Sequence, residues 1–192
     1  MEMVRFRLDA IAALGTGEGD GFVRAEAAAL HGRKVIEAIG FACLVAIENG
    51  AATVPRSAKG QWNAESIFKD LQSKGLDVLP SPSVLRRTTA EEAASGAEIV
   101  VDGQPERRLT HKELAAIYRE LHVWLHEPNP YVHLDSSAFY ARKSEALWAD
   151  LGRLALFMER HAISIHGKAF FCTLRDSHDG KTKVVLLERE CL

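Results

Sequence analysis

The sequence is poor in cysteine, and its three cysteines, Cys43, Cys172 and Cys191, are scattered through 192 residues. They form no C-x-x-C pair, so the spacing argues against a redox motif and against a disulfide framework. Two of them lie in apolar runs, where a free cysteine usually serves as a small core residue. This pattern is typical of a reducing compartment, and we expect the protein to be cytoplasmic.

The chain also lacks a long hydrophobic run and an excess of charge of one sign. Its best membrane candidate, residues 35–47, is too short to span a bilayer and contains Glu37. Residues 1–9 lack the charged-then-apolar order of a signal peptide. With 24 basic and 26 acidic residues, the net charge is −2. No membrane contact is expected, and any nucleic-acid site must be local.

Several catalytic motifs are missing as well. Residues 15–21 contain four glycines but lack the Gly-Lys-Ser/Thr ending of a phosphate-binding loop. The sequence has no G-x-S-x-G elbow of a serine hydrolase, and no G-x-G-x-x-G follows a predicted strand. Serine-hydrolase and dinucleotide-binding chemistry are therefore not expected.

What the sequence does contain is helical periodicity. Its composition, 47% hydrophobic and 26% charged, is typical of a globular domain, and we expect one domain over 1–192. Apolar residues recur at helical spacing, with glycine, proline or a capping residue at the ends, over 1–14, 22–49, 62–73, 110–126 and 144–161. The pattern predicts a mainly α fold whose helical bundle covers 22–165.

Two parts of the chain depart from the helical pattern. Residues 86–108 are polar, with a short strand expected at 98–102, and we interpret them as an insert in the bundle. The β-rich runs 169–174 and 183–188 flank an Asp-Gly turn, which predicts a C-terminal β-hairpin over 167–190. A lone hairpin is marginally stable in water, so this one should pack on the helices.

The most informative stretch runs from Tyr118 to Tyr131 and is rich in charged and imidazole side chains. With Leu114 set at zero on a helix, Arg119, His122 and His126 fall at about 140°, 80° and 120°. All three lie on one flank beside the buried face. Histidines near an arginine can perform acid–base work or bind anions. Alternatively, each histidine only satisfies a backbone carbonyl or caps the helix end.

The same histidines could instead bind a metal ion. His122 and His126 are spaced i, i+4, which can present two ligands to one ion, and His133 or Asp135 could add a third. The intervening residues do not form the H-E-x-x-H motif of metalloproteases.

A second constellation, Arg33 and Glu37, is spaced i, i+4 on the most apolar helix. A charge pair at the edge of a buried face needs compensating partners. Either the pair is a partly exposed intrahelical ion pair, or it faces His126 and orients it.

Taken together, these motifs resemble those of a known protein family. A helix with Arg33-x-x-x-Glu37, followed by a helix that ends in a Leu-His-x-x-Asn-Pro run containing His126 and Asn129, resembles the HEPN-like superfamily. Many members carry an arginine followed by a histidine, and Arg119 and His126, with six residues between them, fit the loosest form of that motif. The resemblance implies a helical bundle, a homodimer, and metal-independent RNA cleavage in toxin–antitoxin or antiphage systems.

The resemblance also implies roles for the candidate residues. His126 would be the general base or acid for attack by a ribose 2′-hydroxyl, and Arg119 would stabilise charge on the phosphate. His122 could assist, while Arg33 and Glu37 could hold the site. No cofactor or metal is needed for this chemistry.

Two other hypotheses about the function stay open. In a non-catalytic interaction module, Arg33, Glu37, His126 and Asn129 would form a buried polar network that fixes helix packing. In a metalloprotein, two or three of the histidines would be ligands.

Overall fold

The computed structural model describes residues 1–51, 54, 56–58, 60–76, 78–94, 96–126, 131, 136–165 and 168–187. Its helical elements are α1 (Glu2–Thr16), α2 (Gly21–Ala46), the π-helical turn η1 (Ile47–Ala51), α3 (Ala64–Ser73), α4 (Ala90–Ala93), the 3-10 turn η2 (Pro105–Arg107), α5 (His111–Val123) and α6 (Ser136–Glu159). The strands are β1 (Ser81–Arg87), β2 (Ile99–Gly103), β3 (Arg160–Ile165), β4 (Lys168–Thr173) and β5 (Lys183–Leu187). The prediction of a mainly helical fold is confirmed.

Helices α2 and α5 each begin at a capping residue. Asp20 Oδ1 accepts hydrogen bonds from the backbone N–H groups of Phe22 and Val23, which starts α2. Thr110 and Glu113 form a capping box that starts α5, at the beginning of the helix expected over 110–126. These contacts are short-range, so the sequence pattern could locate both starts.

The strands form one antiparallel sheet in the order β2-β1-β3-β4-β5. The predicted hairpin is present as β4 and β5, with Phe171 opposite Val185, but it is two strands of a five-stranded sheet. The expected helix over 144–161 starts earlier, at Ser136, and stops at Glu159, because Arg160 and His161 already belong to β3. His161 pairs with Cys172 on one side and with Pro82 on the other, so distant segments decide this boundary.

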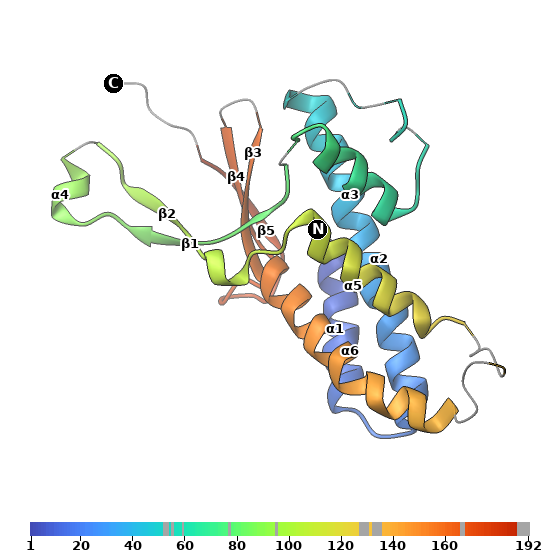
Figure 1. The fold of residues 1–192 in the computed structure, drawn as a ribbon. Helices are drawn as coiled ribbons and strands as arrows, with labels where there is room; N and C mark the ends of the chain where they lie inside the picture. Colours follow the sequence, from blue (N-terminus) through green and yellow to red (C-terminus); the bar gives the residue numbers. More distant parts are fainter. Residues whose placement is uncertain are drawn as a thin grey trace.

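The segment expected as a polar insert forms most of an arm (Figure 1). Only Ser81 and Pro82 of β1 pair with β3, whereas Ser83–Arg87 pair with β2. The β1–α4–β2 arm, residues 83–103, therefore projects away from the helices. Arg86 stabilises it, with contacts of 2.7 Å to Glu92 Oε2 and 2.6 Å to Asp102 Oδ2.

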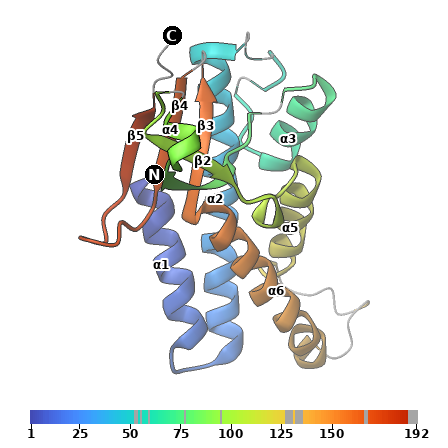
Figure 2. The same ribbon diagram turned by 90° about the vertical axis from the view of Figure 1, so that its left-hand side faces the viewer.

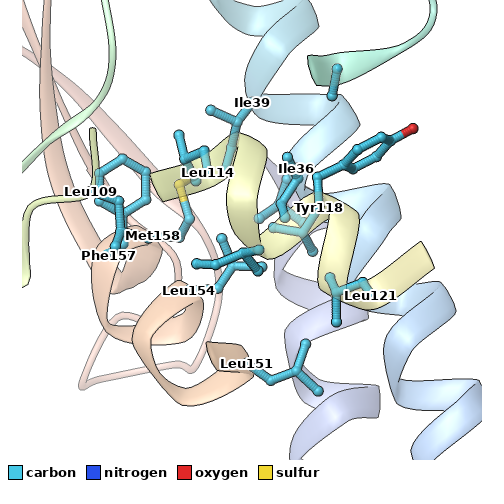
Figure 3. Close-up of a cluster of buried hydrophobic side chains, with 14 of the residues drawn as sticks. Ile36, Ile39, Leu109, Leu114, Tyr118, Leu121, Leu151, Leu154, Phe157 and Met158 are labelled. Atoms are coloured by element: carbon cyan, nitrogen blue, oxygen red, sulfur yellow. The ribbon is translucent and has the colours of Figure 1, made fainter. Parts of the chain in front are cut away.

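The helices pack around α2 (Figure 2). In that view α1 lies on one side of α2, α3 and α5 lie on the other, and α6 crosses in front. Figure 3 shows the core between α2, α5 and α6, formed by Ile36, Ile39, Leu114, Leu121, Leu151, Leu154, Phe157 and Met158. Within the described residues, no helix has the length and apolar content needed to cross a membrane.

Gly32 sets how closely three of these helices approach. A Cβ at Gly32 would lie 2.5 Å from Leu151 Cδ2 on α6 and 3.0 Å from Leu121 Cδ1 on α5. Both leucines are buried. The missing side chain therefore brings α5 close to α2, and the next residue, Arg33, reaches the outer side of α5.

Candidate functional site

Arg33 on α2 contacts two side chains of α5. Its Nη2 donates a hydrogen bond to the Tyr118 hydroxyl at 2.5 Å, and its Nη1 lies 2.5 Å from His122 Nδ1. The guanidinium carbon also lies 4.1 Å from the centre of the Tyr118 ring, in a cation–π arrangement. Tyr118 and His122 are one helical turn apart, so a single guanidinium spans both.

The contact with Arg33 determines the tautomer of His122. A guanidinium only donates hydrogen bonds, so Nδ1 of His122 must be the acceptor, and the ring proton belongs on Nε2. Partial burial lowers the pKa of His122, and the neighbouring His126 and Arg33 lower it further. The ring is therefore neutral at pH 7 and offers an Nε2–H donor from the exposed flank of α5.

His126 lies beside His122, just beyond the end of α5. The two ring centres are 4.2 Å apart, with an interplanar angle of 61°, in an edge-to-face arrangement. The His126 ring is exposed, while its backbone carbonyl accepts a hydrogen bond of 3.1 Å from the Tyr140 hydroxyl on α6. The last turn is thus held to α6, and the imidazole remains open to solvent.

Glu37 completes the cluster from the next turn of α2. Its Oε1 accepts a hydrogen bond from the Tyr118 hydroxyl at 3.2 Å and lies 3.8 Å from Arg33 Nη2. Its Oε2 lies 2.7 Å from Lys34 Nζ. The side chains of Arg33 and Glu37 are only 16% and 13% exposed. Each buried charge therefore has the compensation that its desolvation requires.

Tyr118 joins the two halves of this cluster. Burial raises the pKa of its phenol, against a lowering contribution from Arg33. The hydroxyl therefore stays protonated, accepting from Arg33 and donating to Glu37. Tyr118 was not among the site residues predicted from the sequence. The one available signal was its i, i+4 spacing from His122.

The structure brings four of the six candidate residues together: Arg33, Glu37, His122 and His126. Arg119 is placed apart from them, with a side chain 63% exposed and its Nε 3.5 Å from Glu65 Oε1 on α3. Asn129 lies outside the described residues, as do His133 and Asp135 of the metal reading. Of the two candidate arginines, Arg33 rather than Arg119 contacts an imidazole of the cluster.

The cluster suits an anion better than a cation. Across the part of the chain that the structure describes, no three His, Cys, Asp or Glu side chains are grouped as metal ligands. A metal at His122 would have to displace the Nε2 proton next to the permanent positive charge of Arg33. An anion would instead find an N–H donor, a guanidinium and the second imidazole on one surface.

Comparisons with known proteins add no relative: no family model matches the chain, and neither a curated protein nor a solved structure is significantly similar to it.

Proposed function

We propose that the α2–α5 surface formed by Arg33, His122 and His126 binds the phosphate backbone of RNA and cleaves it without a metal ion. One observation carries this proposal. Arg33 holds His122 as a neutral Nε2–H donor, and the exposed His126 ring lies 4.2 Å from it. A donor, a cation and a free imidazole thus lie within reach of one phosphodiester.

In this mechanism His126 is the general base. It accepts the proton of a ribose 2′-hydroxyl, whose oxygen attacks phosphorus while the bond to the 5′-oxygen breaks. The products are a 2′,3′-cyclic phosphate and a 5′-hydroxyl, and the departing oxygen takes a proton from water, to which the surface is open. The Nε2–H of His122 and the charge of Arg33 stabilise the negative charge that develops on the phosphate.

In this proposal Arg119 binds RNA outside the site of cleavage. It lies on α5 one turn before His122, and its exposed ion pair with Glu65 is long at 3.5 Å. Pairs of this kind are weak. Its guanidinium can therefore exchange Glu65 for a neighbouring phosphate of the same RNA strand, which adds affinity and salt dependence.

The resemblance to HEPN-like proteins points to the same chemistry. It extends the proposal to a cytoplasmic homodimer that acts in a toxin–antitoxin or antiphage system. The Arg33–Glu37 spacing and the position of His126 support this assignment.

The test is an RNA-cleavage assay with single-stranded and structured RNA, in the presence and absence of EDTA. We expect wild-type cleavage that EDTA does not reduce, and a loss of about 10²–10⁴-fold in His126→Ala, the range for a general base. The matched control is His178→Ala, which removes another exposed imidazole from the β4–β5 loop. Equal loss in both variants, or full activity in His126→Ala, would refute the assignment.

A second candidate function is a non-catalytic interaction module. The observation behind it is that Arg33, Tyr118, Glu37 and Lys34 satisfy one another and join α2 to α5. On this reading the cluster only fixes helix packing. Substitution of Tyr118 would then lower the melting temperature, and neither the wild type nor any variant would cleave RNA.

A metalloprotein with His122 and His126 as ligands is the third candidate. Elemental analysis of protein purified without added metal distinguishes this candidate from the other two. A stoichiometric transition metal that is lost in His122→Ala would favour it over the RNA proposal.

A further inference from the structure

Trp62 is a large aromatic residue that the fold leaves in solvent. It stands directly before Asn63, the N-cap of α3, and it is 82% exposed. Trp124, by contrast, is only 3% exposed, as expected for a residue type with so much apolar surface to bury. The folded protein therefore gains little stability from the indole of Trp62.

A hydrophobic residue at this position ordinarily helps to start its helix. The residue before the N-cap often packs on the fourth residue of the helix, in the contact called the hydrophobic staple. In α3 that fourth residue is Ile67, which is fully buried in the core. Because Trp62 remains mostly exposed, other side chains cover Ile67, and Trp62 does not serve as the staple.

The chain is anchored on both sides of Trp62. Ala58, four residues before it, and Ala64, two residues after it, are fully buried. The Asn63 side chain caps α3 by accepting a hydrogen bond of 3.0 Å from the Glu65 N–H. An aromatic side chain on such a fixed segment needs little further ordering when a ligand binds to it.

The segment that carries Trp62 adjoins the α2–α5 surface. Helices α3 and α5 lie side by side in Figures 1 and 2. The backbone N–H of Ala64 is a hydrogen-bond donor to the Tyr118 hydroxyl, which also accepts from Arg33 at 2.5 Å. Figure 3 shows this hydroxyl pointing away from the other labelled residues. Since Trp62 is two residues from Ala64, its Cα lies within about 7 Å of the Ala64 Cα.

Arg119 links the same segment to the phosphate-binding residues. It lies on the exposed flank of α5, three residues before His122, and its Nε is 3.5 Å from Glu65 Oε1 in the first turn of α3. Glu65 follows Trp62 by three residues. The guanidinium assigned above to a neighbouring phosphate is therefore held beside the segment that carries the indole.

A single exposed aromatic residue is ordinary on a protein surface. Beside phosphate-binding residues it gains a specific use. Unpaired bases stack on aromatic rings while cations hold the backbone of the strand, and this combination is how proteins bind single-stranded nucleic acids. In a duplex the bases stack on one another and offer no free face.

We propose that Trp62 stacks on an unpaired base of the RNA strand, next to the phosphate that Arg119 binds, and thereby makes single-stranded RNA the substrate class of the site. The inference rests on the phosphate binding of the proposed function, and it does not depend on the cleavage step. Since every base has a flat face, the contact selects unpaired strands without selecting a sequence.

The first test measures binding apart from cleavage. The probe is a single-stranded 2′-O-methyl oligoribonucleotide, whose blocked 2′-oxygen cannot attack phosphorus. We expect Trp62→Ala to raise its dissociation constant about 5- to 150-fold, the range for loss of one base–aromatic stack. Trp62→Phe should keep most of the affinity. The control is Phe6→Ala, which removes another exposed aromatic residue, 59% exposed on α1, and should change nothing.

The second test separates stacking from charge and from folding. Trp62→Ala should leave the salt dependence of binding unchanged, whereas Arg119→Ala should reduce the slope of log K against log salt by about 0.7, the single-strand value for one phosphate. Trp62→Ala should also keep the wild-type melting temperature, because its indole is exposed. Wild-type affinity in Trp62→Ala, or an equal loss of affinity for a duplex of the same sequence, overturns the inference.

The inference and the proposed chemistry fail in different ways. If the wild type binds the single strand through Trp62 but cleaves no RNA, the inference stands and the cleavage mechanism is wrong. If the wild type cleaves RNA, and Trp62→Ala does so with unchanged KM and kcat, the mechanism stands and the inference is overturned. A wild type that binds no single-stranded RNA overturns both.

Discussion

Arg33 Nη1 and His122 Nδ1 lie 2.5 Å apart although 89 positions separate them in the sequence. Because the guanidinium is always charged, this contact opposes protonation of the ring. It therefore controls both the tautomer and the protonation state of the histidine that the proposed mechanism uses as a donor.

Removal of Arg33 should raise the pKa of His122. Partial burial is the largest cause of the lowered pKa, followed by His126 and then by Arg33. Arg33→Gln removes the last of these, and His126→Ala removes the second. We expect both variants to shift the His122 titration to higher pH, as measured by NMR of the imidazole nitrogens. No shift in Arg33→Gln would show that the contact is absent in solution.

Stability should fall as the solution is acidified through the histidine range. His161 is fully buried, its Nδ1 lies 3.0 Å from the Met158 carbonyl, and its Nε2 has no hydrogen-bond partner among the described residues. Burial lowers its pKa below the ordinary value of 6.5. The unfolded chain therefore binds the proton first, so stability is complete above about pH 6.5 and declines as the pH falls toward the folded-state pKa.

The measurement is urea unfolding at several pH values between about 8 and 5. We expect His161→Leu to flatten the decline, since it removes the buried group that must stay neutral. His31 and His122, whose pKa values are also lowered, contribute with the same sign and leave a residual slope. An unchanged slope in His161→Leu would assign the whole effect to those two exposed or half-buried rings.

Gly32→Ala should destabilise the fold. The added methyl group would meet Leu151 at 2.5 Å and Leu121 at 3.0 Å, and overpacking of this kind costs about 1–3 kcal/mol. The control is Gly152→Ala in α6, where a Cβ would meet nothing within 4 Å. That change should be neutral or stabilising by up to about 1 kcal/mol, from helix propensity alone. Equal effects in denaturant unfolding would contradict the close approach at Gly32.

Tyr118→Phe should cost about 1–3 kcal/mol in the free energy of unfolding. The change removes the hydroxyl that accepts from Arg33 and donates to Glu37, and it leaves two part-buried charges less well paired. Arg119→Ala, which breaks only a long exposed ion pair, is the control and should cost about 0–1 kcal/mol. A Tyr118→Phe variant as stable as the control would rule out a structural role for the hydroxyl.

Local signals explain which parts of the fold could be predicted. The starts of α2 and α5 follow from Asp20 and from the Thr110–Glu113 box, because these residues cap helices through contacts three positions or fewer away. Strand β3 was missed because the helix expected over 144–161 already included its first two residues, Arg160 and His161. Arg160 pairs with Thr173, and His161 pairs with Pro82 and Cys172, so only distant partners draw them into the sheet, and no local pattern reveals such partners.

The same limit applies to the candidate site: local patterns could predict some of its residues, whereas the contact between its helices could not be predicted. Periodicity could place His122 and His126 on one flank of α5, and could place Arg33 and Glu37 near each other. It could not say which arginine faces the histidines, because this depends on how α2 crosses α5 at Gly32. Arg119 was the nearer choice in sequence, but it points to Glu65 on α3, whereas Arg33 reaches His122 from another helix.

The arm has a consequence for how the chain could be shortened. Ser83 and Gly103 are paired in register, so the chain enters and leaves the arm at one point, and the Gln104 N–H closes its base by donating to the Pro82 carbonyl at 2.8 Å. Replacing 84–102 by a tight turn would keep both ends in place and would shorten a loop, a change with little entropic cost. The arm is thus a detachable module, and trimming it should yield a smaller protein that loses α4 but keeps its other helices, the rest of its sheet and the α2–α5 surface.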